Sequence, residues 1–252
     1  MMKYIKFGSG NKNYVIIPGL SIHSVMGMAD AVEKAYHAFT EEYTVYLFDR
    51  PEELREGCTI REITACTAEA MAELHIESAD VFSVSMGGMI AQYLAIDHPE
   101  LVHKLILGST LSRPNDTCQR VVGEWLKLAR AQEEEKLLES FADLVYSKDT
   151  TSVYREAVIA ANRGISAEEY RRFIVQAEAC KSFDCSEELS KVQCPILVLG
   201  AKGDRIVTPE GSREIAEALG CELYLYDESY GHAVYDEAPD YKARCLEFLH
   251  EA

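Results

Sequence analysis

Short apolar runs alternate with longer segments of helical periodicity along most of this chain. Runs of about four to eight apolar residues bounded by turn residues are typical of buried strands, and apolar positions that recur every three or four residues are typical of helices. We expect strands at 2–7, 14–17, 43–48, 81–84, 105–107, 195–200 and 221–226, and helices at 25–39, 59–75, 86–96, 208–220 and 235–250. This alternation predicts an α/β fold, a mainly parallel twisted sheet with helices on both faces, because each parallel crossover needs a helix.

The pattern changes after Pro114, where only helical periodicity is found up to about residue 189. Four helices with charged faces are expected there, at 121–130, 134–145, 153–162 and 167–180. A purely helical block between two strands of such a sheet indicates an excursion from the C-terminal edge of the strands, where open α/β sheets bind ligands. We therefore predict a core formed by residues 1–112 and 190–252, with a helical cap formed by residues 113–189 inserted over the site.

The composition is that of a globular protein with a strong acidic excess. The 252 residues include 42 acidic and 25 basic side chains, which gives a formal net charge of −17. Such a charge repels phosphate backbones and anionic lipid surfaces, so neither nucleic acid nor a membrane is an expected partner. No segment approaches the ~18 consecutive apolar residues of a membrane span, and the N-terminus does not have the pattern of a signal peptide. We expect a cytoplasmic protein.

Eight cysteines are present, and none forms a C-x-x-C pair or stands at zinc-finger spacing from a histidine. In a reducing cytosol we expect all of them to be free thiols and expect no structural metal site. The positions are Cys58, Cys66, Cys118, Cys180, Cys185, Cys194, Cys221 and Cys245.

Ser85 is the candidate nucleophile. It lies between a predicted strand and a predicted helix, where a serine must turn sharply to hold its hydroxyl clear of the sheet edge. The neighbours two positions away, Ser83 and Gly87, are small enough for such a turn, and Gly88 allows the helix to lie close to the sheet.

A serine needs a base, and His232 is the best placed of the seven histidines because it follows the strand at 221–226. His23, in the loop after the strand at 14–17, is the rival, and a pocket-lining role suits it better. Asp204 follows the strand at 195–200 and can orient the imidazole, although a Gly-Asp pair is also common in simple turns. Together the three residues predict a Ser-His-Asp triad.

Acyl transfer also needs hydrogen-bond donors for the developing oxyanion. The backbone N–H of Met86, at the start of its helix, is one candidate. The second is the backbone N–H of Leu20, in the loop after the strand at 14–17, where Gly19 allows a close approach.

These pieces resemble the α/β-hydrolase superfamily over nearly the whole chain, and within it the branch of enol-lactonases and small esterases. The residues that carry the resemblance are Ser83–Gly88, Met89–Gln92, His98–Glu100, Leu105–Leu107, Ser109–Thr110, Gly200–Asp204 and Gly231–His232. The chain order Ser, Asp, His is that of this superfamily. Membership implies the triad, a cap that shapes the acyl pocket, and no metal or organic cofactor.

Three departures from the family pattern stand out. Pro18 precedes Gly19 where the family usually has histidine, Ser83 replaces the first glycine of the G-x-S-x-G turn, and the loop at 49–57 lacks the usual glycine-rich sequence. The first two are compatible with acyl chemistry. The third reshapes a loop near the site, so the substrate of the enol-lactonase branch does not carry over.

The sequence thus predicts a serine hydrolase that cleaves a small ester, thioester or lactone through an acyl-serine. Two alternatives remain: carbon–carbon bond hydrolysis or lyase chemistry on the same residues, and a non-catalytic ligand receptor. In the cap, Arg113 could bind a substrate carboxylate or simply be solvated, and solvation is favoured. Trp125, Tyr146 and Tyr154 could line the pocket or pack between helices, and packing is favoured.

Overall fold

A seven-stranded sheet forms the centre of the protein in a computed structural model, which describes residues 2–251. The strand order is β1-β3-β2-β4-β5-β6-β7, and only β1 runs antiparallel to its neighbour. The strands are β1 (Tyr4–Phe7), β2 (Lys12–Ile17), β3 (Tyr43–Phe48), β4 (Ala79–Val84), β5 (Val102–Gly108), β6 (Ile196–Ala201) and β7 (Glu222–Tyr226). The predicted mainly parallel sheet is confirmed. Although β1 and β2 are consecutive, β3 lies between them.

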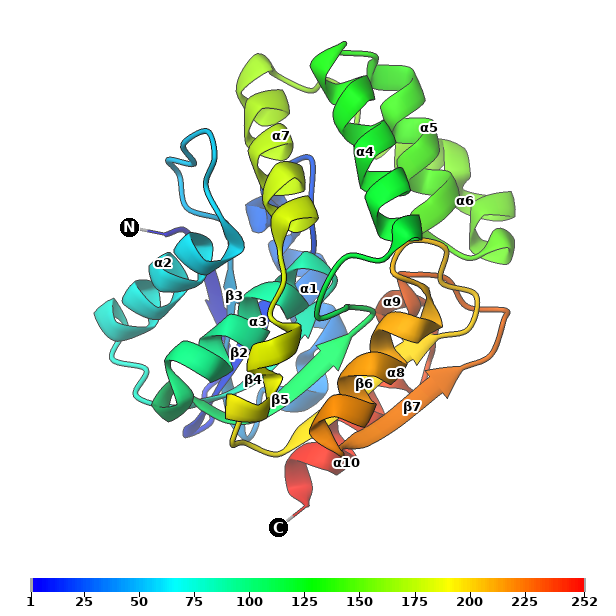
Figure 1. Cartoon of the computed structure of the whole chain (residues 1–252). Helices are drawn as coiled ribbons and strands as arrows, with labels where there is room; N and C mark the ends of the chain where they lie inside the picture. Colours follow the sequence, from blue (N-terminus) through cyan, green and yellow to red (C-terminus); the bar gives the residue numbers. More distant parts are fainter. Residues whose placement is uncertain (1, 252) are drawn as a thin grey trace.

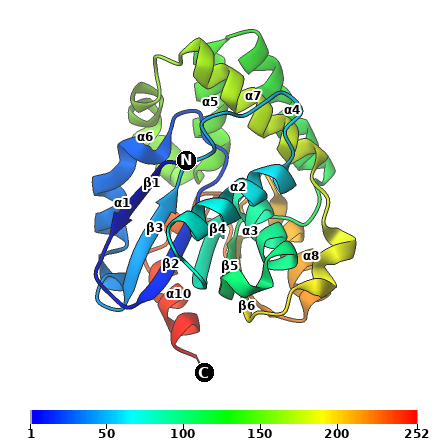
Figure 2. The same ribbon diagram turned by 90° about the vertical axis from the view of Figure 1, so that its left-hand side faces the viewer.

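Helices cover both faces of the sheet (Figures 1 and 2). One face packs against α2 (Ile60–Glu73), α3 (Met86–Asp97) and α8 (Thr208–Leu219), and the other against α1 (Ala29–Ala35) and α10 (Tyr241–His250). The alternation of side chains along each strand divides the core accordingly. In β2, Val15 and Ile17 belong to the first core and Tyr14 and Ile16 to the second.

Local signals set several helix ends as predicted. The Thr59 hydroxyl accepts a hydrogen bond from the Glu62 backbone N–H while the Glu62 side chain accepts one from the Thr59 backbone, which makes a complete capping box. Gly220 ends α8 with a φ of 61°, a left-handed conformation that costs glycine little.

Two segments that were each expected to form one continuous helix are divided in the structure. The segment expected to be helical over 25–39 divides into η1 (Val25–Met28), α1 and η2 (His37–Phe39). The closing helix expected over 235–250 is two helices, α9 (Val234–Glu237) and α10, separated by residues 238–240. Pro239 explains the second break, since proline has no N–H to donate and forces the preceding Ala238 into an extended conformation, here with a ψ of 122°.

Four helices between β5 and β6 lie over the end of the sheet at which the parallel strands finish (Figure 1). They are α4 (Asp116–Arg130), α5 (Glu134–Val145), α6 (Lys148–Ala161) and α7 (Ala167–Ser182), and we call them the four-helix segment. The helix α6 begins five residues before the expected start at Val153, because the Ser147 hydroxyl caps it by accepting from the Thr150 N–H.

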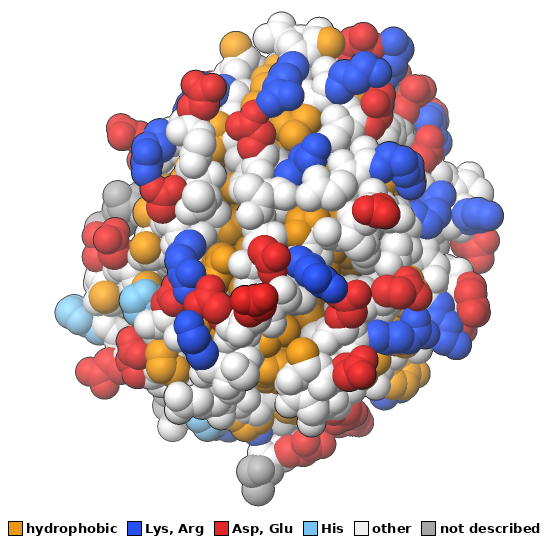
Figure 3. All heavy atoms as spheres, viewed as in Figure 1, with side chains coloured by type: hydrophobic (Ala, Val, Ile, Leu, Met, Phe, Trp, Pro, Cys, Tyr) orange, Lys and Arg blue, Asp and Glu red, His pale blue; other side chains and the backbone are white. Residues whose placement is uncertain are grey.

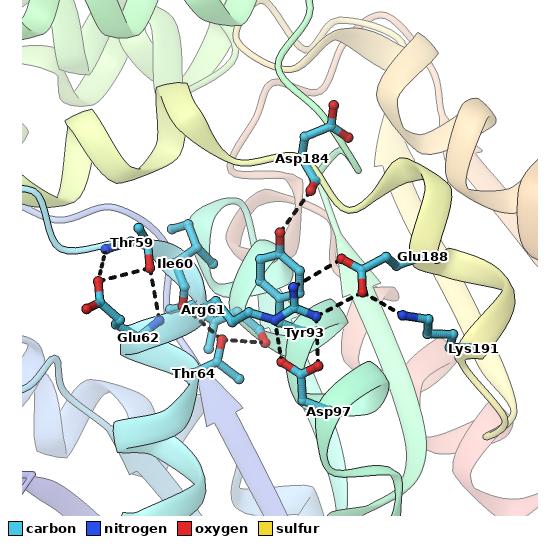
Figure 4. Close-up of polar contacts among 11 residues, drawn as sticks. Thr59, Ile60, Arg61, Glu62, Thr64, Tyr93, Asp97, Asp184, Glu188 and Lys191 are labelled. Carbon is cyan, nitrogen blue, oxygen red and sulfur yellow. Dashed lines mark hydrogen bonds and ion pairs between the residues drawn. The ribbon is translucent and has the colours of Figure 1, made fainter.

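The chain returns from α7 to the core through one short helix, η4 (Ser186–Lys191), and a charged cluster holds this helix in place (Figure 4). The Arg61 guanidinium, from α2, donates to Asp97 at 2.7 and 2.8 Å and to Glu188 at 2.9 and 3.1 Å. It also stacks over the ring of Tyr93, 4.3 Å from the centroid. The Arg61 side chain is 45% exposed, so water and salt screen these ion pairs and each contributes about 1 kcal/mol or less.

The remaining surface carries both signs of charge. On the face drawn in Figure 3, acidic and basic side chains are interspersed around smaller apolar areas.

Within residues 2–251, no helix has the length and apolar character needed to cross a membrane. All eight cysteines are free thiols, as predicted.

Candidate active site

Ser85 occupies the sharp turn between β4 and α3. Its φ of 54° and ψ of −123° fall outside the regions that L-residues prefer. Hydrogen bonds on both sides hold this conformation: the Ser85 N–H donates to the Gly108 carbonyl at 3.0 Å, and the Ser85 carbonyl accepts from the Thr110 hydroxyl at 2.8 Å. A strained residue fixed in this way by its surroundings is typical of a functional position.

Close backbone packing explains the small neighbours of Ser85. A Cβ on Gly87 would lie 2.0 Å from the Ile17 carbonyl oxygen, and one on Gly88 would lie 2.5 Å from the Thr110 hydroxyl. Ser83, which replaces the usual glycine, is fully buried, and its hydroxyl donates to the Ile106 carbonyl at 3.2 Å. The extra polar atom therefore has a partner, and the turn tolerates the serine.

His232 and Asp204 form a buried pair. The His232 Nδ1 lies 2.8 Å from the Asp204 Oδ2, and the two side chains are 7% and 2% exposed. The other carboxylate oxygen of Asp204 accepts from the backbone N–H groups of Ile206 at 2.8 Å and Val207 at 3.1 Å. Because the carboxylate is an acceptor, Nδ1 is the protonated nitrogen of the neutral imidazole and Nε2 is left as the basic atom.

A cavity of about 520 Å³ connects the candidate residues. Ser85 and His232 both line it, and so do Leu20 and Met86, whose backbone N–H groups were predicted to bind an oxyanion. Asp204 lies behind His232. The structure thus brings the predicted nucleophile and base to one cavity, while the roles of the two N–H groups stay a prediction.

The four-helix segment provides a largely apolar wall of this cavity. Its contribution consists of Cys118, Val122, Trp125, Phe141, Val145, Tyr146, Val158, Ala161, Asn162 and Cys180. The Trp125 and Phe141 rings pack with centroids 4.4 Å apart, and the Trp125 N–H donates to the Ser140 hydroxyl at 3.0 Å. Trp125 therefore holds two helices together and also lines the cavity. Tyr146 lines the cavity too, so the prediction that these residues only pack between helices was incomplete. Tyr154 is 59% exposed and does neither.

Arg113 lies outside the cavity, with its Nε 3.9 Å from the Glu214 carboxylate and a side chain 59% exposed. The favoured reading of a solvated arginine is confirmed. Within residues 2–251, no three histidine, cysteine or acidic side chains gather closely enough to hold a metal ion.

Arg50 is a residue near the site that sequence reasoning missed. It is 3% exposed, and its guanidinium donates to the carbonyls of Pro18 and of Gly19, the latter at 2.9 Å. Burial lowers the pKa of Arg50 to about 10, although the neighbouring Asp49 carboxylate opposes this shift. Arg50 fixes the loop that contains Leu20. Its position directly after β3, at the edge where parallel strands end, was the signal available in the sequence.

His23 joins the loop after β2 to the four-helix segment and lines the cavity, as expected from the sequence. Its Nδ1 lies 2.7 Å from the Glu169 carboxylate and its Nε2 lies 2.8 Å from the Asn162 carbonyl oxygen. Both partners are acceptors, so both ring nitrogens can donate only when the imidazole is protonated, and these contacts favour the charged form. Burial by itself lowers the pKa of His23, but the hydrogen bonds to Glu169 and Asn162 outweigh it and raise the pKa above its ordinary value.

The chain matches a known protein family and is similar to known hydrolases. The family described as "Serine aminopeptidase, S33" matches residues 59–238. The protein named "Putative carbamate hydrolase RutD" from Pseudomonas syringae pv. syringae is 26% identical over 202 residues, which cover 77% of this chain and 78% of that protein.

Two solved structures illustrate the shared fold. An α/β-hydrolase from a Medee basin deep-sea metagenome library superposes with a TM-score of 0.88 at 17% identity, covering 100% of this chain and 94% of the other. The enol-lactonase from Burkholderia xenovorans superposes with a TM-score of 0.84 at 20% identity, covering 99% and 96%. With most of its length matched by the family, this chain belongs to the serine aminopeptidase (S33) family of the α/β-hydrolase superfamily.

Proposed function

We propose that the protein is a serine hydrolase that cleaves a small, uncharged ester, thioester or lactone through an acyl-serine intermediate. The observation that carries the proposal is the convergence on one cavity of a strained serine, Ser85, and a histidine, His232, whose Nδ1 is held by a buried carboxylate. A nucleophile, a base and a residue that orients the base are the parts that acyl transfer needs.

In the proposed mechanism, Nε2 of His232 removes the proton from the Ser85 hydroxyl as the serine oxygen attacks the substrate carbonyl. The backbone N–H groups of Leu20 and Met86 stabilise the negative charge on the carbonyl oxygen. His232 then gives the proton to the leaving group, which departs as an alcohol or thiol. A water molecule deprotonated by the same nitrogen attacks the acyl-serine and releases the carboxylic acid. Asp204 stays ionised throughout and stabilises the imidazolium.

The cavity supports an uncharged acyl group. Its wall is mostly apolar, no lysine or arginine among residues 2–251 lines it, and His23 is already paired with Glu169. A substrate carboxylate would lose its hydration there without gaining a free cation. We propose that the four-helix segment acts as a cap that sets the size of this acyl site.

The test uses p-nitrophenyl esters of short acyl chains together with a fluorophosphonate probe. Ser85→Ala should abolish both turnover and labelling, because the remaining groups cannot form the acyl intermediate. Ser83→Gly, which gives the turn its usual family sequence, is the matched control and should retain activity. Ester turnover by Ser85→Ala at the wild-type rate would refute the nucleophile assignment.

The same experiment tests the other functions open to these residues. Product analysis over esters, thioesters, lactones and carbamates separates acyl transfer from carbon–carbon bond cleavage or lyase chemistry. Carbamates are included because a relative carries the name of a carbamate hydrolase. Tight binding of a small molecule without any turnover would favour a receptor and contradict the proposal.

A further inference from the structure

The junction between α5 and α6, residues 143–147, contacts the loops that carry both His232 and Asp204. The base loop, 231–233, docks on it directly. The Ala233 N–H donates to the Val145 carbonyl at 2.8 Å. A Cβ on Gly231 would lie 2.6 Å from the Ser147 nitrogen, so the backbones on either side of His232 are packed against the junction with no room for a side chain.

Glu237 adds a second link between the base loop and the junction. One carboxylate oxygen accepts from the Gly231 N–H at 3.0 Å, and the other accepts from the Ser147 N–H at 2.8 Å. The half-buried carboxylate therefore bridges the residue before His232 and the residue that caps α6. Hydrogen bonds from backbone N–H groups to an ionised acceptor are roughly twice as strong as neutral ones.

The acid loop reaches the same junction through Arg205, the residue after Asp204. The Arg205 guanidinium donates to the carbonyl of Asp143 and, at 3.1 Å, to that of Tyr146. The last carbonyls of a helix lack intrahelical partners and carry partial negative charge, so a cation at this end is favourable. The C-terminal end of α5 thus accepts hydrogen bonds from both loops.

We propose that this junction is the platform that positions the catalytic base, and that Glu237 and Arg205 are positioning residues for His232 and Asp204. The proposal rests on the proposed function, since it assigns a role to the base of that reaction. If this is so, the position of His232 depends on the position of the four-helix segment. A four-helix segment seated on the core holds His232 toward the cavity, and a shift of α5 moves the base as well as the pocket wall.

The first experiment compares Glu237→Gln with Glu134→Gln. Glu134 is the matched control because its carboxylate also bridges two backbone N–H groups, those of Gly164 and Ile165 at 3.0 Å each, but within the four-helix segment and away from the base loop. In either variant the NH₂ group of the new glutamine side chain faces a backbone N–H group, and two donors cannot form a hydrogen bond with each other. Each is assayed for kcat, KM and the second-order rate of fluorophosphonate labelling, with the thermal midpoint measured alongside.

Glu237→Gln is expected to lower kcat and the labelling rate about tenfold or more, because small displacements of a catalytic group are costly, and to leave KM within about twofold. Glu134→Gln should lose thermal stability with an unchanged labelling rate. Equal labelling rates for Glu237→Gln and wild type would overturn the role of Glu237. An equal loss of labelling in the two variants would show a general effect of stability and would overturn it too.

A second pair of variants keeps the test decisive if Glu237→Gln does not fold. Arg205→Ala removes the link from the acid loop. Arg155→Ala removes a cation that binds the Asp143 side chain at 2.7 Å in the same junction without contacting either loop. The downfield proton resonance of the His232 Nδ1–H should weaken or shift in Arg205→Ala and persist in Arg155→Ala. An unchanged resonance and labelling rate in Arg205→Ala would overturn the proposal.

The two levels of inference fail in different ways. If Ser85→Ala is unlabelled and inactive while the Glu237 and Arg205 variants label at the wild-type rate, the platform is wrong and the serine hydrolase stands. If Ser85→Ala remains active, the proposed function is wrong, and Glu237 and Arg205 then have no catalytic base to position.

Discussion

The sheet edge around Ser85 and the four-helix segment above it border the same cavity under different physical constraints. At the edge, the backbones of α3 and β2 are in direct contact. Gly87 lies so close to Ile17 that an added methyl group would be 2.0 Å from the Ile17 carbonyl oxygen. In the four-helix segment, apolar side chains such as Trp125 and Phe141 form the wall. A methyl group added to Gly123, on α4, would lie 3.3 Å from the end of the flexible Lys181 side chain. Reacting atoms require fixed positions, whereas a pocket wall requires volume and polarity. We therefore expect substitutions at the edge to affect stability and rate, and substitutions in the segment to affect selectivity.

The largest effect is expected from Gly87→Ala. Backbone atoms rather than a movable side chain oppose the new methyl group, so β2 and α3 must separate, and we expect a loss of about 3 kcal/mol in the free energy of unfolding. The turn at Ser85 should distort with it and activity should fall. Urea denaturation monitored by circular dichroism measures the first effect, and ester turnover measures the second.

Gly123→Ala is the control for that comparison. The Lys181 ammonium can move away from the new methyl group, and alanine is favoured over glycine in a helix interior by up to about 1 kcal/mol. This variant should be as stable as wild type or more so, with unchanged turnover. Equal destabilisation by the two substitutions would remove the distinction between the edge and the segment.

A smaller effect, in selectivity, is expected from Trp125→Phe. The smaller ring enlarges the cavity and leaves the Ser140 hydroxyl without its donor, at a cost of about 1–2 kcal/mol in stability. Because Trp125 lines the cavity that we propose holds the acyl group, kcat/KM should shift toward longer acyl chains while kcat for acetyl esters changes little. A chain-length profile identical to that of wild type would show that Trp125 only packs. Tyr154→Phe, at an exposed position on α6, is the control.

The smallest effect is expected where the two regions are joined by His23 and Glu169. The raised pKa of His23 means that its contribution to stability is fully present below the ordinary histidine pKa of about 6.5 and is lost as pH rises through the raised value. Burial opposes ionisation of Glu169, but the hydrogen bonds from His23 and Ser166 lower its pKa to about 2, so its contribution is lost only as pH falls toward that value.

His23→Gln tests this pH dependence because glutamine can donate hydrogen bonds but cannot titrate. The difference in thermal midpoint between wild type and variant should be greatest below the ordinary histidine pKa of about 6.5 and should shrink as the pH rises through the raised pKa of His23. His37→Gln, an exposed histidine on the η2 turn, is the control. A difference that does not vary with pH would show that His23 contributes shape and not charge.

Much of the fold follows from local sequence. Apolar runs predicted the strands, and capping residues such as Thr59 and Gly220 predicted helix ends, because these preferences depend on a few adjacent residues. The turn at Ser85 was predictable for the same reason, since its small neighbours are close in sequence. Even the break before α10 was marked by Pro239, a signal that the apolar periodicity obscured.

By itself, therefore, the sequence determined the parallel α/β architecture, the helical insertion and the identities of Ser85, Asp204 and His232 as candidates. Only the tertiary structure decided that Arg50 lies under the loop of Leu20, that Arg113 stays outside the cavity, and that Glu237 joins the base loop to the four-helix segment. Short-range patterns fix the backbone of a turn or a helix, because the interacting atoms are covalently near. The partner of a carboxylate or a guanidinium is instead chosen by packing between segments that can be a hundred or more residues apart, and no local pattern contains that choice.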